Sequence, residues 1–140
     1  MTARNATILI VDDELPERKR MRGILRTADY EVIESRDYAE ALALFQRRRD
    51  EIDMLLIDVS LPGNNGCELA RASLEIAPNV KILLISGHTG AEVCRFYGIP
   101  ATDVHFLEKP FRALDLLARV KYVLESSEPL AGSASGGLSQ

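Results

Sequence analysis

The sequence has no tryptophan, only two cysteines and no long apolar run. The longest apolar stretches hold about six residues, far short of the roughly 20 that a membrane-spanning helix needs, and the N-terminus lacks the apolar core of a signal peptide. Cys67 and Cys94 match no zinc or redox spacing, so we expect free thiols in a reducing compartment. These absences exclude a disulfide scaffold and a membrane span, and they favour a cytoplasmic location.

The sequence also lacks a strong charge of either sign. Its formal net charge is -4 over 140 residues, and its basic residues are scattered. The one short basic cluster, residues 47–49, is interpreted as a solvated helix end whose charge suits the helix dipole. Direct binding of nucleic acid is therefore not expected. The chain length fits one globular domain with a single core.

Five short β-rich apolar runs alternate with stretches of helical period. The helical stretches place apolar residues at i, i+3, i+4 and i+7, as Met21, Ile24, Leu25 and Ala28 do in the first one. Strands that are apolar on both faces and are separated by helices are typical of a parallel sheet covered on both sides. We therefore predict a three-layer (βα)5 sandwich of the α/β class. The strands are predicted over residues 6–11, 30–34, 53–57, 80–86 and 103–108.

The predicted helices carry local signals of their own. Asp37 and Glu40 resemble a capping box at the start of the second helix, and Pro78 follows the end of the third. After Leu124 the sequence becomes "ESSEPLAGSASGGLSQ", which is small, polar and without periodicity. Such a segment cannot bury enough apolar surface to offset the entropy of ordering it. We expect one domain over residues 1–126 and a disordered tail or linker stub over 127–140.

Polar residues end four of the five apolar runs. In open parallel α/β sheets, ligands bind beyond the carboxyl ends of the strands. Taken singly, an aspartate or a serine there can cap the following helix, and a lysine can be solvated. Their joint position along one edge of the predicted sheet instead indicates a functional site. Its members are Asp12 and Asp13 of "VDDE", Asp58, Ser86 of "SGH" and Lys109 of "EKPF".

Carboxylates gathered at one edge predict a divalent cation. Two carboxylates about 4 Å apart, at an effective dielectric constant near 20, repel by roughly 4 kcal/mol. A few carboxylates, with water and a phosphoryl oxygen, are typical ligands of Mg²⁺, whereas His88 and His105 match no zinc spacing. With Mg²⁺ and Lys109 as cations and Ser86 as a donor, this edge suits phosphoryl transfer. We therefore predict that Asp58 is a nucleophile that forms an aspartyl phosphate.

Four motifs, "ILIVDDE", "DVSLPGNNG", "ISG" and "EKPF", resemble in their order and spacing the receiver domain of two-component response regulators. The resemblance covers about residues 6–125. We accordingly expect a flavodoxin-like sheet with the strand order 2-1-3-4-5. The residue roles that the resemblance implies are Asp58 as phosphoacceptor; Asp12, Asp13, Asp58 and the Ser60 backbone carbonyl as Mg²⁺ ligands; Ser86, Lys109 and Phe106 as phosphoryl-binding and switch residues; and Pro110 after a cis peptide bond.

This sequence departs from the family pattern at two switch positions. Ser86 stands where threonine is frequent, which keeps the hydroxyl donor but loses a methyl group that stiffens the rotamer. Phe106 stands where tyrosine is commoner, so it can fill a pocket but cannot donate a hydroxyl hydrogen bond. Ser60 and His88 flank the site at positions that tune the lifetime of the phosphoryl group in the family.

The resemblance implies a signalling module and not a metabolic enzyme. It would take a phosphoryl group from a histidine of a sensor histidine kinase or a histidine phosphotransfer protein, and would catalyse only its own phosphorylation and dephosphorylation. The switched surface would be the face of the fourth helix, fifth strand and fifth helix. A homodimer is a further expectation, and no downstream effector is predicted. "LPGNNGCELAR" and "LEKPF" are similar to receivers at the C-terminus of hybrid histidine kinases.

Two alternatives use the same architecture. A Mg²⁺-dependent phosphatase or phosphotransferase of the haloacid dehalogenase type also has a strand-end aspartate nucleophile, but it requires an acid two residues later, where Ser60 stands. A flavin-binding module requires hydroxyl and glycine residues after the first strand to hold a phosphate. The sequence there is "DDELP", which would repel a phosphate without a metal ion.

Overall fold

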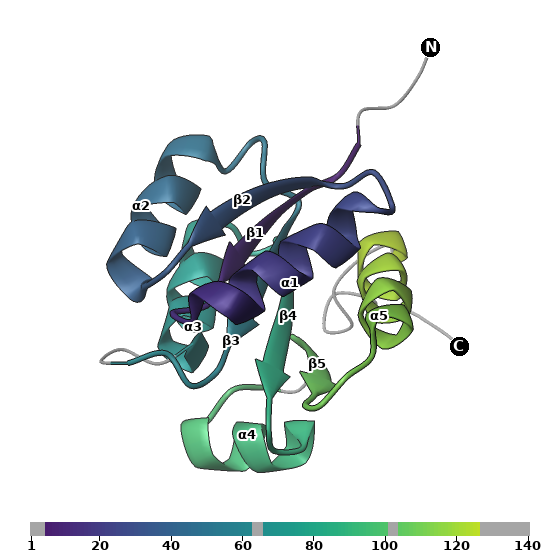
Figure 1. Cartoon of the computed structure of the whole chain (residues 1–140). Helices are drawn as coiled ribbons and strands as arrows, with labels where there is room; N and C mark the ends of the chain where they lie inside the picture. The colour runs from purple at the N-terminus through teal and green to yellow at the C-terminus, as the bar shows by residue number, and fades with distance from the viewer. Residues whose placement is uncertain (1–4, 63–65, 101–103, 127–140) are drawn as a thin grey trace.

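The structure is a computed structural model, and it describes residues 5–62, 66–100 and 104–126 (Figure 1). Within these residues, strands and helices alternate along the chain. The strands are β1 (Thr7–Val11), β2 (Glu31–Ser35), β3 (Met54–Asp58), β4 (Lys81–Ser86) and β5 (His105–Glu108). The helices are α1 (Leu15–Arg26), α2 (Tyr38–Arg48), α3 (Gly66–Ile76), α4 (Gly90–Tyr97) and α5 (Ala113–Glu125).

The strands form one parallel sheet in the order β2-β1-β3-β4-β5. Val11 near the end of β1 lies opposite Ile57, and Asp58 at the end of β3 lies opposite Ile85. The predicted (βα)5 fold and its strand order are confirmed. Since all strands run the same way, the ends of β1, β3 and β4 meet along one edge of the sheet.

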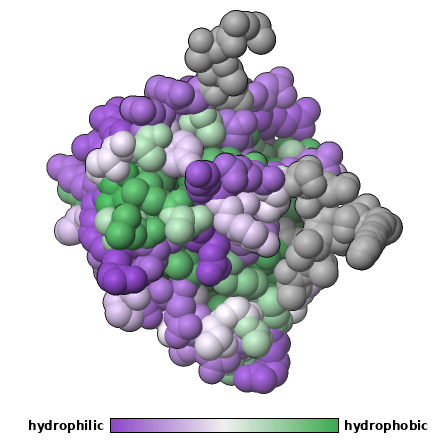
Figure 2. Space-filling view, turned by 90° about the vertical axis from the view of Figure 1, so that its right-hand side faces the viewer, coloured by the Kyte–Doolittle hydropathy of each residue, from purple (hydrophilic) through white to green (hydrophobic). Residues whose placement is uncertain are grey.

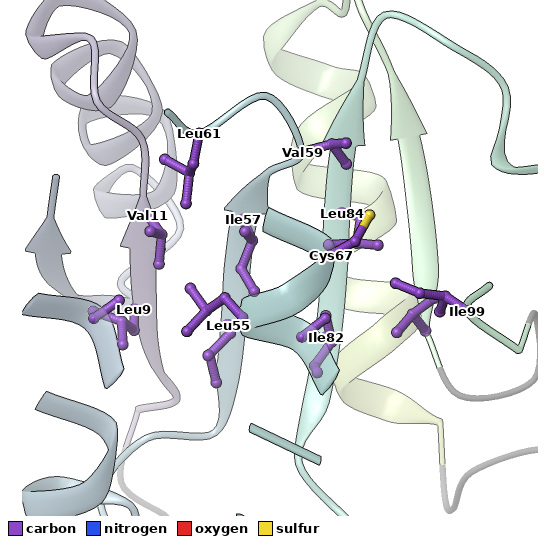
Figure 3. Packing of buried hydrophobic residues seen from close by; sticks show 14 of the residues in the cluster. Leu9, Val11, Leu55, Ile57, Val59, Leu61, Cys67, Ile82, Leu84 and Ile99 are labelled. Atoms are coloured by element: carbon purple, nitrogen blue, oxygen red, sulfur yellow. The ribbon is translucent and has the colours of Figure 1, made fainter. Parts of the chain in front are cut away.

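Alternate residues of each strand feed two separate cores. On one face, Leu9 and Val11 of β1 pack with side chains of β3, β4, α2 and α3, and Figure 3 shows this row of side chains. On the other face, Ile8 and Ile10 of β1 pack against α1 and α5. The strands β1 and β3 are buried at every position. Burial on both faces explains why their sequences are continuously apolar instead of alternating.

Polar side chains fix the starts of two helices. Asp37 accepts a hydrogen bond from the Glu40 N–H and caps α2, but the Glu40 carboxylate accepts from the Arg36 N–H and not from Asp37. One half of the predicted capping box is therefore present, and in the other half the Glu40 carboxylate bonds the residue before Asp37. A complete capping box stands at α4, between Thr89 and Glu92. This box, and not Ser86, caps the fourth helix.

Element boundaries differ from the sequence predictions by one or two residues. Every strand begins one or two residues after its predicted start. Tyr30 and Val80, just before β2 and β4, donate their N–H groups back to the preceding helix or turn and not to the sheet. The first helix ends two residues before the end of its predicted apolar stripe: α1 ends at Arg26, and Ala28 is exposed in a turn where Asp29 has a φ of 67°. Residue 103 and the predicted tail, 127–140, lie outside the described residues.

The outer surface is mostly hydrophilic, with hydrophobic patches on the face shown in Figure 2. Among the described residues, no helix combines the length and the apolar character needed to cross a membrane. Within the same described residues, the large hydrophobic side chains that stay exposed are Leu15, Phe96, Tyr97, Leu114 and Tyr122.

Candidate functional site

Three strand ends close with the same type of turn. In each, the side chain of the last polar residue accepts a hydrogen bond from the backbone N–H two residues later. A short polar side chain can thus end a buried strand, because it satisfies a backbone group that the sheet leaves free. The pairs are Asp12 with Glu14, Asp58 with Ser60 and Ser86 with His88, each at 2.9 Å.

Asp58 is buried and doubly anchored. Its residue is 5% exposed; Oδ2 accepts a hydrogen bond from Lys109 Nζ at 2.8 Å, and Oδ1 accepts one from the Ser60 hydroxyl at 2.8 Å. Burial alone would raise the pKa of Asp58, but the hydrogen bonds from Lys109 and Ser60 outweigh it and hold the pKa below its usual value. Burial likewise opposes the charge of Lys109, yet its bond to Asp58 raises the Lys109 pKa. Both groups are charged at neutral pH.

Asp12 lies beside this pair without a cation of its own. It is 2% exposed, and within the described residues its carboxylate forms no ion pair. Burial, and then the negative charges of Asp58 and Asp13, raise the Asp12 pKa to about 6, although the Glu14 N–H and Lys109 oppose this rise. Since Lys109 is already paired with Asp58, the Asp12 carboxylate adds a negative charge that the site does not balance. Asp13 itself is exposed.

The donor set fits a hard cation that keeps most of its water. No group of three or more His, Cys, Asp or Glu residues in the described part of the chain could hold a metal ion by itself. Two buried carboxylates, Asp12 and Asp58, instead offer a few oxygen ligands beside an unbalanced charge. That is the donor chemistry of Mg²⁺, which takes one or two carboxylates and retains several waters, and not that of zinc.

The ends of β4 and β5 complete the rim of the site, which is the row of polar side chains at the strand ends that includes Asp12 and Asp58. Ser86 is 5% exposed, and its backbone carbonyl accepts a hydrogen bond from the Lys109 N–H at 2.7 Å. The Lys109–Pro110 peptide bond is cis. A cavity of about 480 Å³ opens beside Asp58, Ser60 and Ser86, and the α4 aromatics Phe96 and Tyr97 line its other side. A larger cavity, about 560 Å³, lies at the opposite edge of the sheet and contains none of these groups.

Two glycines allow close packing around the rim. A Cβ on Gly66 would lie 2.3 Å from the Asp58 backbone oxygen, and a Cβ on Gly90 would lie 2.7 Å from the Phe106 ring. Gly66 thus lets α3 begin directly against the end of β3. Phe106 is half-buried, packs against the core on the α2 and α3 face, and sits under the start of α4.

The structure brings most of the sequence-predicted residues together. Asp58, Ser60 and Lys109 are hydrogen-bonded, and Asp12 and Ser86 end neighbouring strands; Phe106 lies behind this rim. Sequence reasoning missed the hydroxyl contact from Ser60 to Asp58 and the role of Arg18, whose Nη1 donates to the Asp12 carbonyl at 2.8 Å. The spacing of two residues between Asp58 and Ser60 is the signal of an Asx turn. No comparable local signal marks Arg18.

The family model described as the response regulator receiver domain matches residues 8–121. The chain belongs to this family. It is a phosphoacceptor module of two-component signal transduction, and the haloacid dehalogenase alternative gains no support.

Several known proteins are similar in sequence to this receiver domain. It is 35% identical over 125 residues to the phosphate regulon transcriptional regulatory protein PhoB of Pseudomonas aeruginosa, covering 88% of this chain and 53% of PhoB. It is 32% identical over 127 residues to the sensor kinase CckA of Brucella abortus, covering 89% of this chain and 13% of CckA. The chain spans about half the length of PhoB and of the aerobic respiration control protein ArcA of Escherichia coli.

Solved structures share the fold at similar identity. The chemotaxis protein CheY4 of Vibrio cholerae is 30% identical with a TM-score of 0.76, covering 85% of this chain and 98% of CheY4. The response regulator receiver protein of Sinorhizobium medicae is 30% identical with a TM-score of 0.77, covering 89% of this chain and 98% of that protein.

Proposed function

We propose that Asp58 accepts a phosphoryl group from a phosphohistidine of a sensor histidine kinase or a histidine phosphotransfer protein. The observation that carries this proposal is the surroundings of the Asp58 carboxylate: it is buried, and Lys109 and Ser60 both donate hydrogen bonds to it, which lowers its pKa and favours the ionised form. A charged carboxylate in a shielded site is a competent oxygen nucleophile. One of the relatives is named a sensor kinase and others transcriptional regulators, which supports a histidine kinase as the donor.

In the proposed transfer, a carboxylate oxygen of Asp58 forms a bond to phosphorus while the bond from phosphorus to the imidazole nitrogen breaks. The bonding electron pair leaves with the imidazole. Lys109 Nζ, already 2.8 Å from Asp58 Oδ2, is placed to follow the charge onto a phosphoryl oxygen. Mg²⁺, held by Asp12, Asp13, Asp58 and the Ser60 carbonyl, would neutralise the remaining phosphoryl charge.

The proposed readout is a movement of Ser86 and Phe106. Ser86 would donate its hydroxyl to the phosphoryl group, and Phe106 would follow and change the α4–β5–α5 face. Four of the exposed large hydrophobic side chains lie on α4 and α5, which supports a partner surface there. The chain would act on no other substrate and catalyse only its own phosphorylation and dephosphorylation, in the cytoplasm. The four exposed hydrophobic side chains on α4 and α5 are Phe96, Tyr97, Leu114 and Tyr122.

The test is a phosphorylation assay with a matched pair of aspartate variants. The chain is incubated with acetyl phosphate and Mg²⁺, with and without EDTA, and its intact mass is measured under mild conditions. We expect one added phosphoryl group in the wild type and in Asp53→Asn, and none in Asp58→Asn or with EDTA. A folded wild type that gains no mass from acetyl phosphate or from phosphorylated kinases would refute the proposal.

A further inference from the structure

Arg18 joins the β1–α1 turn to strand β2 behind the acidic rim. Its Nη1 donates to the Asp12 backbone carbonyl at 2.8 Å, and its Nε donates to Glu34 Oε1 at 3.1 Å. The Arg18 side chain is 14% exposed and that of Glu34 23%, so water screens this ion pair only in part. The planar guanidinium therefore holds one atom of the acidic turn and one of the neighbouring strand in a fixed relation.

Two further polar groups of Asp12 also form hydrogen bonds. Its N–H donates to the Ser35 carbonyl at 3.1 Å, and its Oδ1 accepts from the Glu14 N–H at 2.9 Å. Among the described residues, Oδ2 accepts no hydrogen bond. The turn thus presents one carboxylate oxygen, and the direction of that oxygen depends on how the Asp12 backbone is held.

Arg22 provides an internal comparison. It lies one turn further along α1, and its Nη1 donates to Glu34 Oε2 at 2.7 Å. Both arginines bind the same carboxylate, but within the described residues only Arg18 also reaches the Asp12 carbonyl. Loss of a positive charge beside Glu34 should therefore have the same effect in an Arg18 variant and in an Arg22 variant. Only an Arg18 variant should also change the turn that contains Asp12.

We propose that Arg18 is a positioning residue, which fixes the Asp12 backbone and thereby aims the Asp12 carboxylate at the cation site beside Asp58. This inference rests on the proposed Mg²⁺-dependent function. Arg18 contacts the carbonyl and not the carboxylate, so its contribution is to the orientation of a ligand. Groups that orient a metal ligand in this way commonly change metal affinity about tenfold or more when they are removed.

The first measurement uses metal-free protein and does not depend on activity. Backbone amide NMR shifts are compared for the wild type, Arg18→Gln, Arg18→Lys and Arg22→Gln. The Asp13 amide shares its peptide group with the Asp12 carbonyl, so loss of the Arg18 hydrogen bond should shift it. We expect the Asp13 amide to move furthest in Arg18→Gln and to stay near its wild-type position in Arg22→Gln.

The second measurement is the Mg²⁺ dissociation constant, obtained by following the same amides. We expect it to rise about tenfold in Arg18→Gln and less than about twofold in Arg22→Gln. Arg18→Lys should fall between them, because an ammonium group cannot bond the Asp12 carbonyl and Glu34 with the geometry of the guanidinium fork. Urea unfolding checks that each variant is folded. If Arg18→Gln does not fold, Arg18→Lys carries the comparison.

Two results would overturn the proposal: a wild-type Mg²⁺ affinity in the Arg18 variants, or an equal loss of affinity in Arg22→Gln. Failure of the proposed function looks different. In that case the wild type would bind no Mg²⁺ or gain no phosphoryl group, while the Asp13 amide in metal-free protein would still report whether Arg18 holds the turn.

Discussion

Asp53 directly precedes strand β3 and Asp58 is its last residue, so the two aspartates lie at the amino and carboxyl edges of the sheet. At the amino edge, Asp53 Oδ2 accepts a hydrogen bond from the Thr7 N–H at 2.8 Å, and the Asp53 N–H donates to the Thr7 carbonyl at 2.9 Å. At the carboxyl edge, Asp58 binds the Lys109 ammonium and the Ser60 hydroxyl. A backbone partner cannot leave without disrupting β1, whereas side-chain partners can rotate to a phosphoryl oxygen. The contact of Asp53 is therefore structural, whereas the contacts of Asp58 can be exchanged for contacts with a phosphoryl group.

The largest expected effect tests how tightly the carboxyl edge is packed. In Gly66→Ala the new Cβ would lie 2.3 Å from the Asp58 backbone oxygen and 2.9 Å from the Val59 Cα. Backbone atoms cannot move aside without distorting the end of β3, so we expect the free energy of unfolding to fall by about 3 kcal/mol or more. Urea unfolding measures this change.

The matched control for that variant is Gly23→Ala in α1. Apart from its chain neighbours and the backbone of α1 itself, no described atom lies within 4 Å of its added Cβ. Alanine is also the better helix former, so we expect stabilisation of about 0.5–1 kcal/mol. Equal effects at both glycines would mean that the end of β3 has room to relax, and that the edge is not rigidly built.

The second prediction concerns the negative charge of the Asp12 carboxylate at the carboxyl edge. Since the Asp12 pKa is raised from 3.8 to about 6, the folded state holds this proton more tightly than the unfolded state. Stability should therefore fall as the pH rises from about 4 through about 6, by about 3 kcal/mol at most. In EDTA at pH 7, Asp12→Asn should be more stable than the wild type by about 2–3 kcal/mol.

Urea unfolding between pH 4 and pH 8 measures that difference, and Mg²⁺ supplies its control. Added Mg²⁺ should stabilise the wild type at pH 7 and should have little effect on Asp12→Asn, because one carboxylate ligand is lost. If the free energy of unfolding depended on pH in the same way in the wild type and in Asp12→Asn, the Asp12 carboxylate would not be an unbalanced charge in the folded protein.

The sequence predicted the layout of this edge better than its contacts. Apolar runs of helical and strand period are local features, so the (βα)5 order and the polar strand ends could be predicted from them together with the family resemblance. The difference between Asp12, 2% exposed, and its exposed neighbour Asp13 depends on where the turn points its side chains. The bond from Arg18 to the Asp12 carbonyl depends on how α1 packs against β2, which no spacing in the sequence records.

The smallest expected loss of stability is at the amino edge. Asp53→Ala removes the acceptor of the Thr7 N–H, a group that belongs to a residue only 8% exposed. Leaving that donor without its carboxylate should lower the free energy of unfolding by about 1–2 kcal/mol, as measured by urea unfolding. The rate of phosphorylation by acetyl phosphate should stay within about twofold of the wild type, because the carboxyl edge keeps Asp58, Lys109 and Ser60. A large loss of phosphorylation at unchanged stability would instead mean that the two ends of β3 are coupled, and that the division between a structural and a functional aspartate on this strand is wrong.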